Sequence, residues 1–417
     1  MFELTLLDLP AAPLQLARRL AGRDHVALFW AKNGALAYLS CDPVEHSAAL
    51  DPEPELLAAS RSRLHEVPRW VGLLPYEARR ELERSRHGSG RAAPHVVDPH
   101  WVRYAAVAEI GKAGVRVVGD QEERVRALAA LLRQSPPPIA SQVRVERRAE
   151  FEPPEVHRAR IQRALEHIRA GDLYQVSLAR RFELNVRGAA WDVLGRMLER
   201  GPAPFAIAFS WAGLNVVSVS PELFLTTDSC GEILTSPIKG TRPRGESPER
   251  DSELARELDA DPKERAELTM VLDVERNDLA RLARPGTVRL TTPPHVERHG
   301  TVLHRVATLG ATLRPEVTRT ELLLRMLPSG SVTGAPKVRA MDLIAELEAE
   351  RRGLYTGAFG YLAHDGSLEL GMAIRTLTVQ GGVGHYWAGG GIVADSDPER
   401  EVQETLWKAE ALLRLLR

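Results

Sequence analysis

The clearest structural signal in this sequence is PFAIAFSWAGLNVVSVSPELFLTT, residues 204–227. It contains three runs of apolar, β-branched and aromatic residues, at 204–211, 214–218 and 223–227, and turn-forming residues separate them. Runs of this length and composition, broken by turn formers, are typical of successive β-strands. This stretch therefore predicts a fold that is rich in antiparallel sheet.

Similar patterns continue on both sides of this stretch. Strands are also expected at residues 174–184, 287–290, 301–313, 355–363, 368–379 and 385–393, and helices at 156–170, 191–200, 252–258, 263–283, 318–326, 336–350 and 399–416. Many antiparallel strands with helices between them favour an α+β fold over strict βαβ alternation. We expect large layered antiparallel sheets flanked by helices.

The chain of 417 residues is longer than a typical single domain, yet a large mixed fold can reach this size around one centre. A proline-rich stretch, residues 135–155, is predicted to be a linker. It separates an N-terminal α/β region, residues 1–134, from a larger region, residues 156–417. We expect the two regions to form one intertwined fold.

The composition is that of a soluble globular protein, with 44% hydrophobic and 27% charged residues. The formal net charge of −1 gives no field that would attract nucleic acid or an anionic membrane. Cys41 and Cys230 have no metal-type spacing, and neither a signal peptide nor an apolar run of membrane-spanning length is evident. We therefore expect a cytoplasmic protein that binds neither nucleic acid nor membrane.

Two segments carry paired carboxylates. Asp261-Pro262 and Asp397-Pro398 each read as a helix start, with Asp at the N-cap and Pro at the first helical position. Glutamates three residues apart follow each start and share one helix face: Glu264 with Glu267, and Glu401 with Glu404. Such acidic residues are often only favourable partners of the helix dipole. If the two helices meet, however, four carboxylates would need a cation, and oxygen ligands suit Mg²⁺.

Two single residues are further candidates. Glu222 lies between Pro221 and an apolar run, where partial desolvation would raise its pKa toward that of a general acid, although an edge-strand glutamate facing water is an equal alternative. Lys239 lies in a turn-rich segment, where burial would make it a nucleophile but exposure would make it an ordinary solvated lysine.

Two glycine-containing stretches complete the set. The loop PSGSVTGAPK, residues 328–337, lacks the Gly-Lys-Ser/Thr of a phosphate loop, so nucleotide binding is rejected, though its N–H groups could hold a carboxylate. Gly389, Gly390 and Gly391 allow a ligand to approach the backbone just before the second glutamate pair. Tyr355 and Arg375 offer a hydroxyl and a guanidinium for an anion, whereas a lone strand histidine such as His304 is more often structural.

Taken together, the sequence resembles the chorismate-binding enzymes, which include anthranilate synthase component I, aminodeoxychorismate synthase component I, and the isochorismate and salicylate synthases. The blocks that carry the resemblance are PIKGTRPRG, KERAELTMVLDVERNDLAR, PSGSVTGAPKVRAM, GAFGYL, IRTL and GGGIVADSDPEREVQETLWKA. They lie between about residue 171 and the C-terminus, and GLLPYEA (residues 72–78) is the clearest trace before them. The resemblance implies the layered fold of these synthases, with residues 156–417 as the chorismate-binding catalytic region.

The resemblance also implies roles for single residues. Mg²⁺ would be surrounded by Glu264, Glu267, Glu401 and Glu404 and would hold the ring carboxylate of chorismate, with backbone contact from Gly391. The enolpyruvyl carboxylate would be held by Tyr355 and Arg375, while Thr241 and His304 would line the ring. Glu222 would protonate the departing ring hydroxyl.

Two positions distinguish members of the family. Water-adding members have a Lys base where this chain has Gln175, and Gln is no base at neutral pH, so isochorismate formation is disfavoured. Aminodeoxychorismate synthases show Lys at the position of Lys239, where anthranilate and salicylate synthases usually show Ala. The resemblance is therefore closest to aminodeoxychorismate synthase component I, the large subunit of para-aminobenzoate synthase.

That member implies a product and a partner. Lys239 would add to the ring, and ammonia would then displace it to give 4-amino-4-deoxychorismate for para-aminobenzoate and folate synthesis. Anthranilate synthase component I, in tryptophan synthesis, is the alternative. The chain shows no cysteine in a nucleophile-elbow context, so a separate glutaminase subunit is expected to supply the ammonia.

Overall fold

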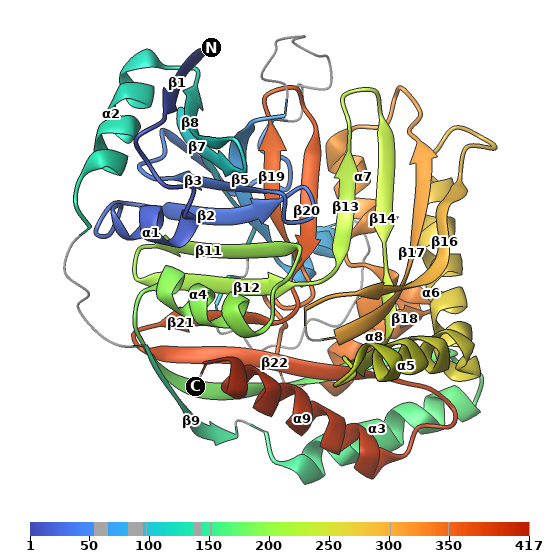
Figure 1. Ribbon diagram of the computed structural model, residues 1–417. Helices are drawn as coiled ribbons and strands as arrows, with labels where there is room; N and C mark the ends of the chain where they lie inside the picture. Colours follow the sequence, from blue (N-terminus) through green and yellow to red (C-terminus); the bar gives the residue numbers. More distant parts are fainter. Residues whose placement is uncertain are drawn as a thin grey trace.

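Two large antiparallel sheets form the centre of the protein. The computed structural model describes residues 1–53, 66–81, 95–96, 98–136, 143–150, 152–300, 302–348 and 350–416. In Figure 1 the long strands β11, β12, β21 and β22 of one sheet run across the view, whereas β13, β14, β19 and β20 of the other stand upright. The α+β prediction is confirmed by this arrangement.

The larger sheet combines strands from both ends of the chain. Its order is β1-β8-β7-β3-β2-β11-β12-β21-β22-β10-β18, with β9 also paired to β10. These strands are β1 (Phe2–Leu6), β2 (Val26–Ala31), β3 (Leu36–Ser40), β7 (Ala106–Gly111), β8 (Gly114–Gly119), β9 (Arg144–Glu150), β10 (Gln175–Arg187), β11 (Phe205–Trp211), β12 (Leu214–Ser220), β18 (Gly334–Ala335), β21 (Thr376–Gln380) and β22 (Val383–Ile392). The 1–134 and 156–417 regions therefore share a sheet, and β9 lies within the stretch predicted as a linker.

The second sheet also takes strands from both regions. Its order is β15-β17-β14-β13-β20-β19-β5-β6-β4, with β16 paired to β17. Its strands are β4 (Glu45–Ser47), β5 (Pro68–Leu74), β6 (His100–Arg103), β13 (Leu223–Thr227), β14 (Glu232–Ser236), β15 (Ile238–Pro243), β16 (Arg289–Arg298), β17 (Val302–Thr312), β19 (Ala358–Ala363) and β20 (Leu368–Met372). Both β14 and β15 were missing from the sequence prediction.

Helices cover the outer faces of the two sheets, as Figure 1 shows. They are α1 (Pro13–Arg18), α2 (Glu122–Arg133), α3 (Pro154–Arg169), α4 (Ala190–Arg200), α5 (Pro248–Ala260), α6 (Pro262–Ala280), α7 (Arg319–Met326), α8 (Lys337–Leu347) and α9 (Pro398–Leu416), with short 3-10 turns at Tyr76–Glu81 and Gly330–Val332. Helices α2 and α4 pack on the larger sheet, and α6 packs on β17 of the smaller sheet.

The core lies between the sheets and beneath these helices. Phe29 of the larger sheet and Tyr361 of the smaller one are buried against each other, with ring centroids 5.7 Å apart. Such tightly packed aromatic side chains contribute strongly to burial. The order of layers is therefore helices, sheet, sheet, helices.

The chain passes from one sheet to the other twice at the same place. Glu222 connects β12 with β13, and the segment ending at Arg375 connects β20 with β21. The two passages are hydrogen-bonded together, because the N–H of Met372 donates to the carbonyl of Glu222 at 3.0 Å and that of Val219 to the carbonyl of Arg375 at 3.3 Å. The single strand predicted at residues 368–379 is thus wrong: Arg375 has a φ of 51°, which no continuous strand can contain.

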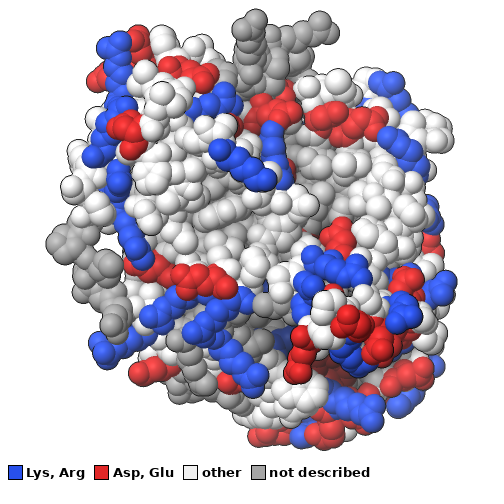
Figure 2. All heavy atoms as spheres, viewed as in Figure 1, with Lys and Arg blue, Asp and Glu red and all other residues white. Residues whose placement is uncertain are grey.

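The surface has a mixed charge. Figure 2 shows basic and acidic side chains intermingled around the rim of the face it displays, with largely uncharged surface near its middle. This pattern agrees with the net charge of −1. Within the described residues, none of the helices combines the length and the apolar character needed to span a lipid bilayer.

Candidate active site

The two predicted helix starts are present. Asp261 is the N-cap of α6, and its side chain accepts hydrogen bonds from the N–H groups of Lys263 and Glu264 at 3.0 and 3.3 Å. At the start of α9 the side chain of Asp397 accepts from the N–H of Arg400 at 2.9 Å. Each cap orients the first turn of its helix, and the glutamate pairs lie in or just after those turns.

The four glutamates are neighbours, although no three of their carboxylates have oxygens within 4.8 Å of one another. The charges of Glu264 and Glu404 both raise the pKa of Glu267, although Glu404 belongs to the other helix. Burial raises the pKa of Glu401, and the charge of Glu404 raises it further. Carboxylates that raise one another's pKa are close like charges. The predicted convergence of α6 and α9 is therefore present in the structure.

A glycine stretch lets the backbone approach this cluster. A Cβ on Gly390 would lie 3.0 Å from Oε2 of Glu401 and 3.6 Å from Oε1 of Glu404. Gly391 pairs with Ser177 on β10, and a Cβ on it would lie only 2.1 Å from the side-chain amide nitrogen of Gln175. A side chain at either position would crowd the carboxylates or displace Gln175.

Each carboxylate has one partner of its own. Lys408 lies 2.7 Å from Glu404, Arg242 lies 3.3 Å from Glu264, and Lys263 lies 3.8 Å from Glu267. The hydroxyl of Ser396 donates to Glu401 at 2.8 Å. These residues were not anticipated from the sequence, in which single basic or hydroxyl residues near a helix start carry no distinctive signal. The donor set of four carboxylates consists of hard oxygens, which fits Mg²⁺.

Glu222 is buried and not at a wet strand edge. Its side chain is 4% exposed, and burial raises the pKa of its carboxyl group to about 7. The hydroxyl of Ser331 donates to Glu222 Oε1 at 2.5 Å. A carboxyl group with a pKa near neutrality can give or take a proton at working pH. The general-acid interpretation of the sequence is thus favoured over the alternative of a wet edge residue.

Lys239 lies between this acid and the glutamate cluster. Desolvation lowers the pKa of its amine, while the nearby charges of Glu267 and Glu222 oppose that effect. The side chain is half-buried on β15. An amine with a lowered pKa is neutral more often and can act as a nucleophile.

His304, Thr241 and Arg375 form a chain of hydrogen bonds. His304 Nδ1 lies 3.0 Å from the hydroxyl of Thr241, and Nε2 lies 3.4 Å from Nη2 of Arg375. A guanidinium only donates, so Nε2 must accept and the proton of the neutral ring is on Nδ1. Burial and the charge of Arg375 lower the pKa of His304 to about 3, which agrees with a neutral ring.

Tyr355 was predicted to begin a strand at 355–363, but it lies before the strand in the structure, because β19 begins only at Ala358. Its ring stacks on Trp387 with centroids 5.8 Å apart. The buried hydroxyl of Tyr386 interacts electrostatically with both Tyr355 and Arg375. Tyr386 therefore lies near both of the predicted anion-binding residues. The sequence prediction missed this residue.

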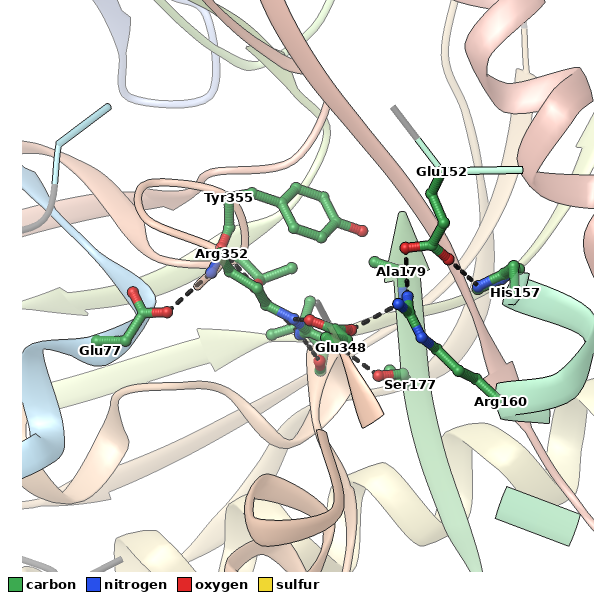
Figure 3. A network of polar contacts seen from close by, with 11 residues as sticks. Glu77, Glu152, His157, Arg160, Ser177, Ala179, Glu348, Arg352 and Tyr355 are labelled. Atoms are coloured by element: carbon green, nitrogen blue, oxygen red, sulfur yellow. Dashed lines mark hydrogen bonds and ion pairs between the residues drawn. The ribbon is translucent and has the colours of Figure 1, made fainter. Parts of the chain in front are cut away.

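A buried polar network fixes the segment before Tyr355, as Figure 3 shows. Glu348 accepts two hydrogen bonds from Arg352, at 2.7 and 2.9 Å, and a third from the N–H of Ala179 at 2.9 Å. Glu77, from the N-terminal region, accepts from the N–H of Arg352 at 2.8 Å. Charge-assisted bonds of this kind are strong when desolvated. The network therefore ties Tyr355 to both regions of the chain.

The loop at residues 328–337 holds a carboxylate of the protein itself. Oε1 of Glu275, on α6, accepts from the N–H of Gly330 at 2.7 Å and from the hydroxyl of Ser329 at 2.6 Å. Backbone N–H groups in such a turn readily bind anions. The loop thereby positions Ser331 against Glu222.

Comparisons with known proteins point in one direction. The family described as chorismate binding enzyme matches residues 16–414. Anthranilate synthase component 1 of Thermus thermophilus is 45% identical over 254 residues, which are 61% of this chain and 55% of that protein. Anthranilate synthase component 1 1 of Haloarcula marismortui is 35% identical over 365 residues, which are 82% of this chain and 74% of that protein. The chain thus spans about half the length of the Thermus relative.

Solved structures agree with the sequence comparisons. Anthranilate synthase component I from Streptococcus pneumoniae has a TM-score of 0.76 at 28% identity, covering 94% of this chain and 90% of that one. MenF, the menaquinone-specific isochorismate synthase from Escherichia coli, has a TM-score of 0.80 at 20% identity, covering 100% of this chain and 94% of that one. The second likeness concerns the fold alone.

Proposed function

We propose that this chain, which belongs to the family of chorismate-binding enzymes, catalyses the Mg²⁺-dependent amination of chorismate by ammonia. The observation that carries this proposal is the convergence of the α6 and α9 glutamates beside Lys239 and the buried Glu222. That arrangement provides carboxylates for a cation, an acid with a pKa of about 7 and a desolvated amine in one place.

The substrate carries two carboxylates, and the site offers two regions to hold them. Glu264, Glu267, Glu401 and Glu404 would hold Mg²⁺, which supplies positive charge for the ring carboxylate when it is bound. Gly391 directly follows Gly390, whose α-carbon lies beside that cluster, so its N–H would contact the same carboxylate. Arg375 and Tyr355 would bind the enolpyruvyl carboxylate, since a guanidinium matches a carboxylate well. Thr241 and His304 would then lie along the ring.

The acid of the reaction is Glu222 in this proposal. With a pKa of about 7, a substantial part of the population is protonated at neutral pH. A protonated Glu222 would give its proton to the departing ring hydroxyl, and the bond from the ring carbon to that oxygen would break. Gln175, close to Gly391, offers no base to activate water, which weighs against isochorismate as the product.

The relatives favour anthranilate as the product, and this is the first candidate. The curated relatives reported above, and the S. pneumoniae structure, are named anthranilate synthase component 1 or I. In this reading the ring is aminated, pyruvate is lost, and Lys239 acts as a charge partner of Glu222 and Glu267 without forming a bond to the substrate. The names of these relatives therefore support anthranilate synthase component I, the alternative inferred from the sequence, better than aminodeoxychorismate synthase component I, the main interpretation.

One specific observation favours the second candidate, 4-amino-4-deoxychorismate. Lys239 stands between Glu222 and Glu267, and desolvation lowers the pKa of its amine. Its neutral amine would add to the ring as the hydroxyl leaves as water with the proton from Glu222. Ammonia would then form its own bond to the ring and release the lysine amine. Pyruvate would be retained.

A product assay separates the two candidates. The purified chain is incubated with chorismate, Mg²⁺ and ammonium, and the products are followed by anthranilate fluorescence, pyruvate release and mass spectrometry. Fluorescence with stoichiometric pyruvate supports anthranilate, whereas an aminated product without pyruvate supports 4-amino-4-deoxychorismate. The Lys239→Ala variant is the partner experiment. It should lose most activity if Lys239 is the nucleophile and retain the product if Lys239 is only a charge partner.

Ammonia would reach this site from a separate glutaminase subunit. Among the described residues, Cys230 is exposed, and the thiol of Cys41 donates to the carboxylate of Asp42 at 3.4 Å and not to a histidine. Free ammonium should replace the subunit in vitro. Glutamine alone should therefore support no turnover by the isolated chain, while ammonium should.

A further inference from the structure

Three histidines meet at the surface of the N-terminal region, away from the glutamate cluster. His25 immediately precedes β2, His46 lies on β4, and His100 begins β6. Each offers one ring nitrogen, and the three nitrogens lie within 4.8 Å of one another. Because β2 belongs to the larger sheet whereas β4 and β6 belong to the smaller one, this histidine cluster joins the two sheets.

The rings are held in place by their neighbours. His100 stacks on Trp211 with centroids 4.2 Å apart and an interplanar angle of 10°. His25 contacts the ring of His46 edge-on at 4.6 Å, and its Nδ1 lies 2.6 Å from the carboxylate of Asp24. Two of the three rings are thus packed in a fixed orientation, while His46 remains exposed.

Simple packing of histidine rings is the ordinary explanation of such a cluster, but it leaves a polar atom without a partner. Nε2 of His100 is buried and has no hydrogen-bond partner among the described residues. Buried polar atoms are nearly always satisfied, and a metal ion is one partner that an imidazole nitrogen can accept.

We propose that His25, His46 and His100 bind one zinc ion, with water at a fourth position. Three imidazoles are nitrogen ligands of the kind that Zn²⁺ prefers, and three protein ligands plus water is a common tetrahedral arrangement. Zn–N bonds of about 2.0–2.1 Å place the ligand nitrogens about 3.3 Å apart.

Asp24 strengthens this assignment. A carboxylate beside one ring nitrogen of a metal-binding histidine orients the ring and makes the other nitrogen a better ligand. Asp24 Oδ1 lies 2.6 Å from Nδ1 of His25, near enough to take this role once the two groups align as a hydrogen bond, and Nε2 of His25 is then left for the ion. The site is chemically distinct from the glutamate cluster, whose oxygen ligands suit Mg²⁺. Bound zinc would cross-link the two sheets at this edge, a role independent of the proposed reaction.

Calorimetric titration of the whole chain with zinc chloride, in several millimolar Mg²⁺ to occupy the glutamate cluster, tests the proposal. The wild-type chain should bind one zinc ion, and zinc should raise its melting temperature. His46→Ala should weaken this binding by about 100-fold or more, because even loss of an outer partner of a metal ligand costs 10- to 100-fold. His46 is exposed, so the variant should fold normally.

His295→Ala is the control, because the side chain of His295, on β16, is 40% exposed and His295 does not belong to the histidine cluster. It should bind zinc and gain melting temperature like the wild type. His100→Ala should behave like His46→Ala. Absence of zinc binding by the wild-type chain in Mg²⁺ would overturn the proposal, as would equal binding by wild type and His46→Ala. Neither result bears on the amination of chorismate, which the product assay tests separately.

Discussion

The hydroxyl of Ser331 donates a hydrogen bond of 2.5 Å to the carboxyl group of Glu222, although the two residues are 109 positions apart in the sequence. Ser331 lies in the loop that leads to α8, and Glu222 lies at the passage between the sheets. The bond opposes the effect of burial on the pKa of Glu222, because a donated hydrogen bond favours the charged form. Ser331 is therefore expected to tune the proposed acid.

Replacement of Ser331 by alanine should shift the pH profile of the reaction. Activity should fall as pH rises through the pKa of about 7 of Glu222, because the proposed acid must be protonated. Loss of the donor raises that pKa, so the falling limb of kcat/KM should move to higher pH by up to about one unit. The measurement is kcat/KM from pH 6 to 9 at constant free ammonia.

Ser367→Ala is the control for this shift. Ser367 lies between β19 and β20, and its hydroxyl donates to the carboxylate of Asp365 at 2.6 Å and not to Glu222. Its falling limb should stay at the wild-type pH. A limb that moves to lower pH in Ser331→Ala would contradict the role assigned to the Ser331–Glu222 bond.

Glu222→Gln should inactivate the protein but stabilise it at alkaline pH. Folding raises the pKa of Glu222 from 4.5 to about 7, so the folded state holds the proton more tightly. Stability therefore falls as pH rises from about 4.5 to about 7, and the full cost remains above pH 7. Glutamine cannot ionise, so the free energy of unfolding should rise by roughly 3 kcal/mol at pH 8.

Urea unfolding at pH 8 and at pH 4.5 measures this effect. The advantage of Glu222→Gln should largely vanish at pH 4.5, where the carboxyl group of the wild-type protein is protonated in the folded state. Turnover should fall by about 10²- to 10⁴-fold, the usual contribution of a general acid. An advantage that is the same at both pH values would show that ionisation of Glu222 does not cause it.

Glu401→Gln should weaken Mg²⁺ binding but stabilise the Mg²⁺-free protein. The pKa of Glu401 is raised by burial and by Glu404, so loss of its charge relieves repulsion in the metal-free protein. Without Mg²⁺ the variant should melt at a higher temperature than wild type. Added Mg²⁺ should raise the melting temperature of the wild type more, because a ligand stabilises the state that binds it. The Mg²⁺ concentration for half-maximal rate should rise at least about tenfold.

Glu399→Gln is the matched variant for Glu401→Gln. Glu399 lies in the same first turn of α9, but its side chain is 66% exposed and pairs with Arg158. This variant tests whether the changes in Mg²⁺ response and melting temperature arise only from lost interaction with the helix dipole. At an exposed position that interaction contributes less than about 1 kcal/mol. Equal Mg²⁺ responses of the two variants would remove Glu401 from the metal site.

Glu348→Gln should destabilise the protein and weaken substrate binding. Glu348 and Arg352 are both 2% exposed and are joined at 2.7 Å, so the variant leaves a buried guanidinium without its counter-charge. Breaking such a pair costs about 3–5 kcal/mol. Because Arg352 also lies 5.8 Å from the ring of Tyr355, KM for chorismate should rise more than kcat falls. Urea unfolding and steady-state kinetics measure both effects.

The control for Glu348→Gln is Glu346→Gln, in the last turn of α8, which ends just before Glu348. Glu346 pairs with Arg163 at 2.9 Å, but both side chains are more than a third exposed. Its replacement should change the free energy of unfolding by less than about 1 kcal/mol. Comparable destabilisation by the two variants would mean that burial of the Glu348–Arg352 pair contributes nothing.

Local signals allowed much of this fold to be predicted. Asp261-Pro262 and Asp397-Pro398 start helices in the structure as the sequence indicates, since an N-cap and a proline act within one turn. The strand Leu223–Thr227 was predicted with its exact bounds. The break at Arg375 was missed, because nothing in its neighbours reveals that the strands on either side belong to different sheets.

The site was predictable only where several residues share one signal. Paired glutamates at helical spacing gave the acidic cluster, but Ser331 depends on a contact across 109 positions that no local pattern encodes. The histidine cluster is another such case, because His25, His46 and His100 are joined only by the pairing of β4 with β6 and the packing of β2. Long-range contacts of this kind require the folded coordinates.

The reaction of chorismate with ¹⁵N-ammonium and Mg²⁺, followed by mass spectrometry, tests the proposed amination most directly. The wild-type chain should give a ring product that contains one labelled nitrogen, and Glu401→Gln should form far less of it at the same Mg²⁺ concentration. A product without label, such as isochorismate, or unchanged chorismate under conditions where the chain is folded and binds Mg²⁺, would contradict the account.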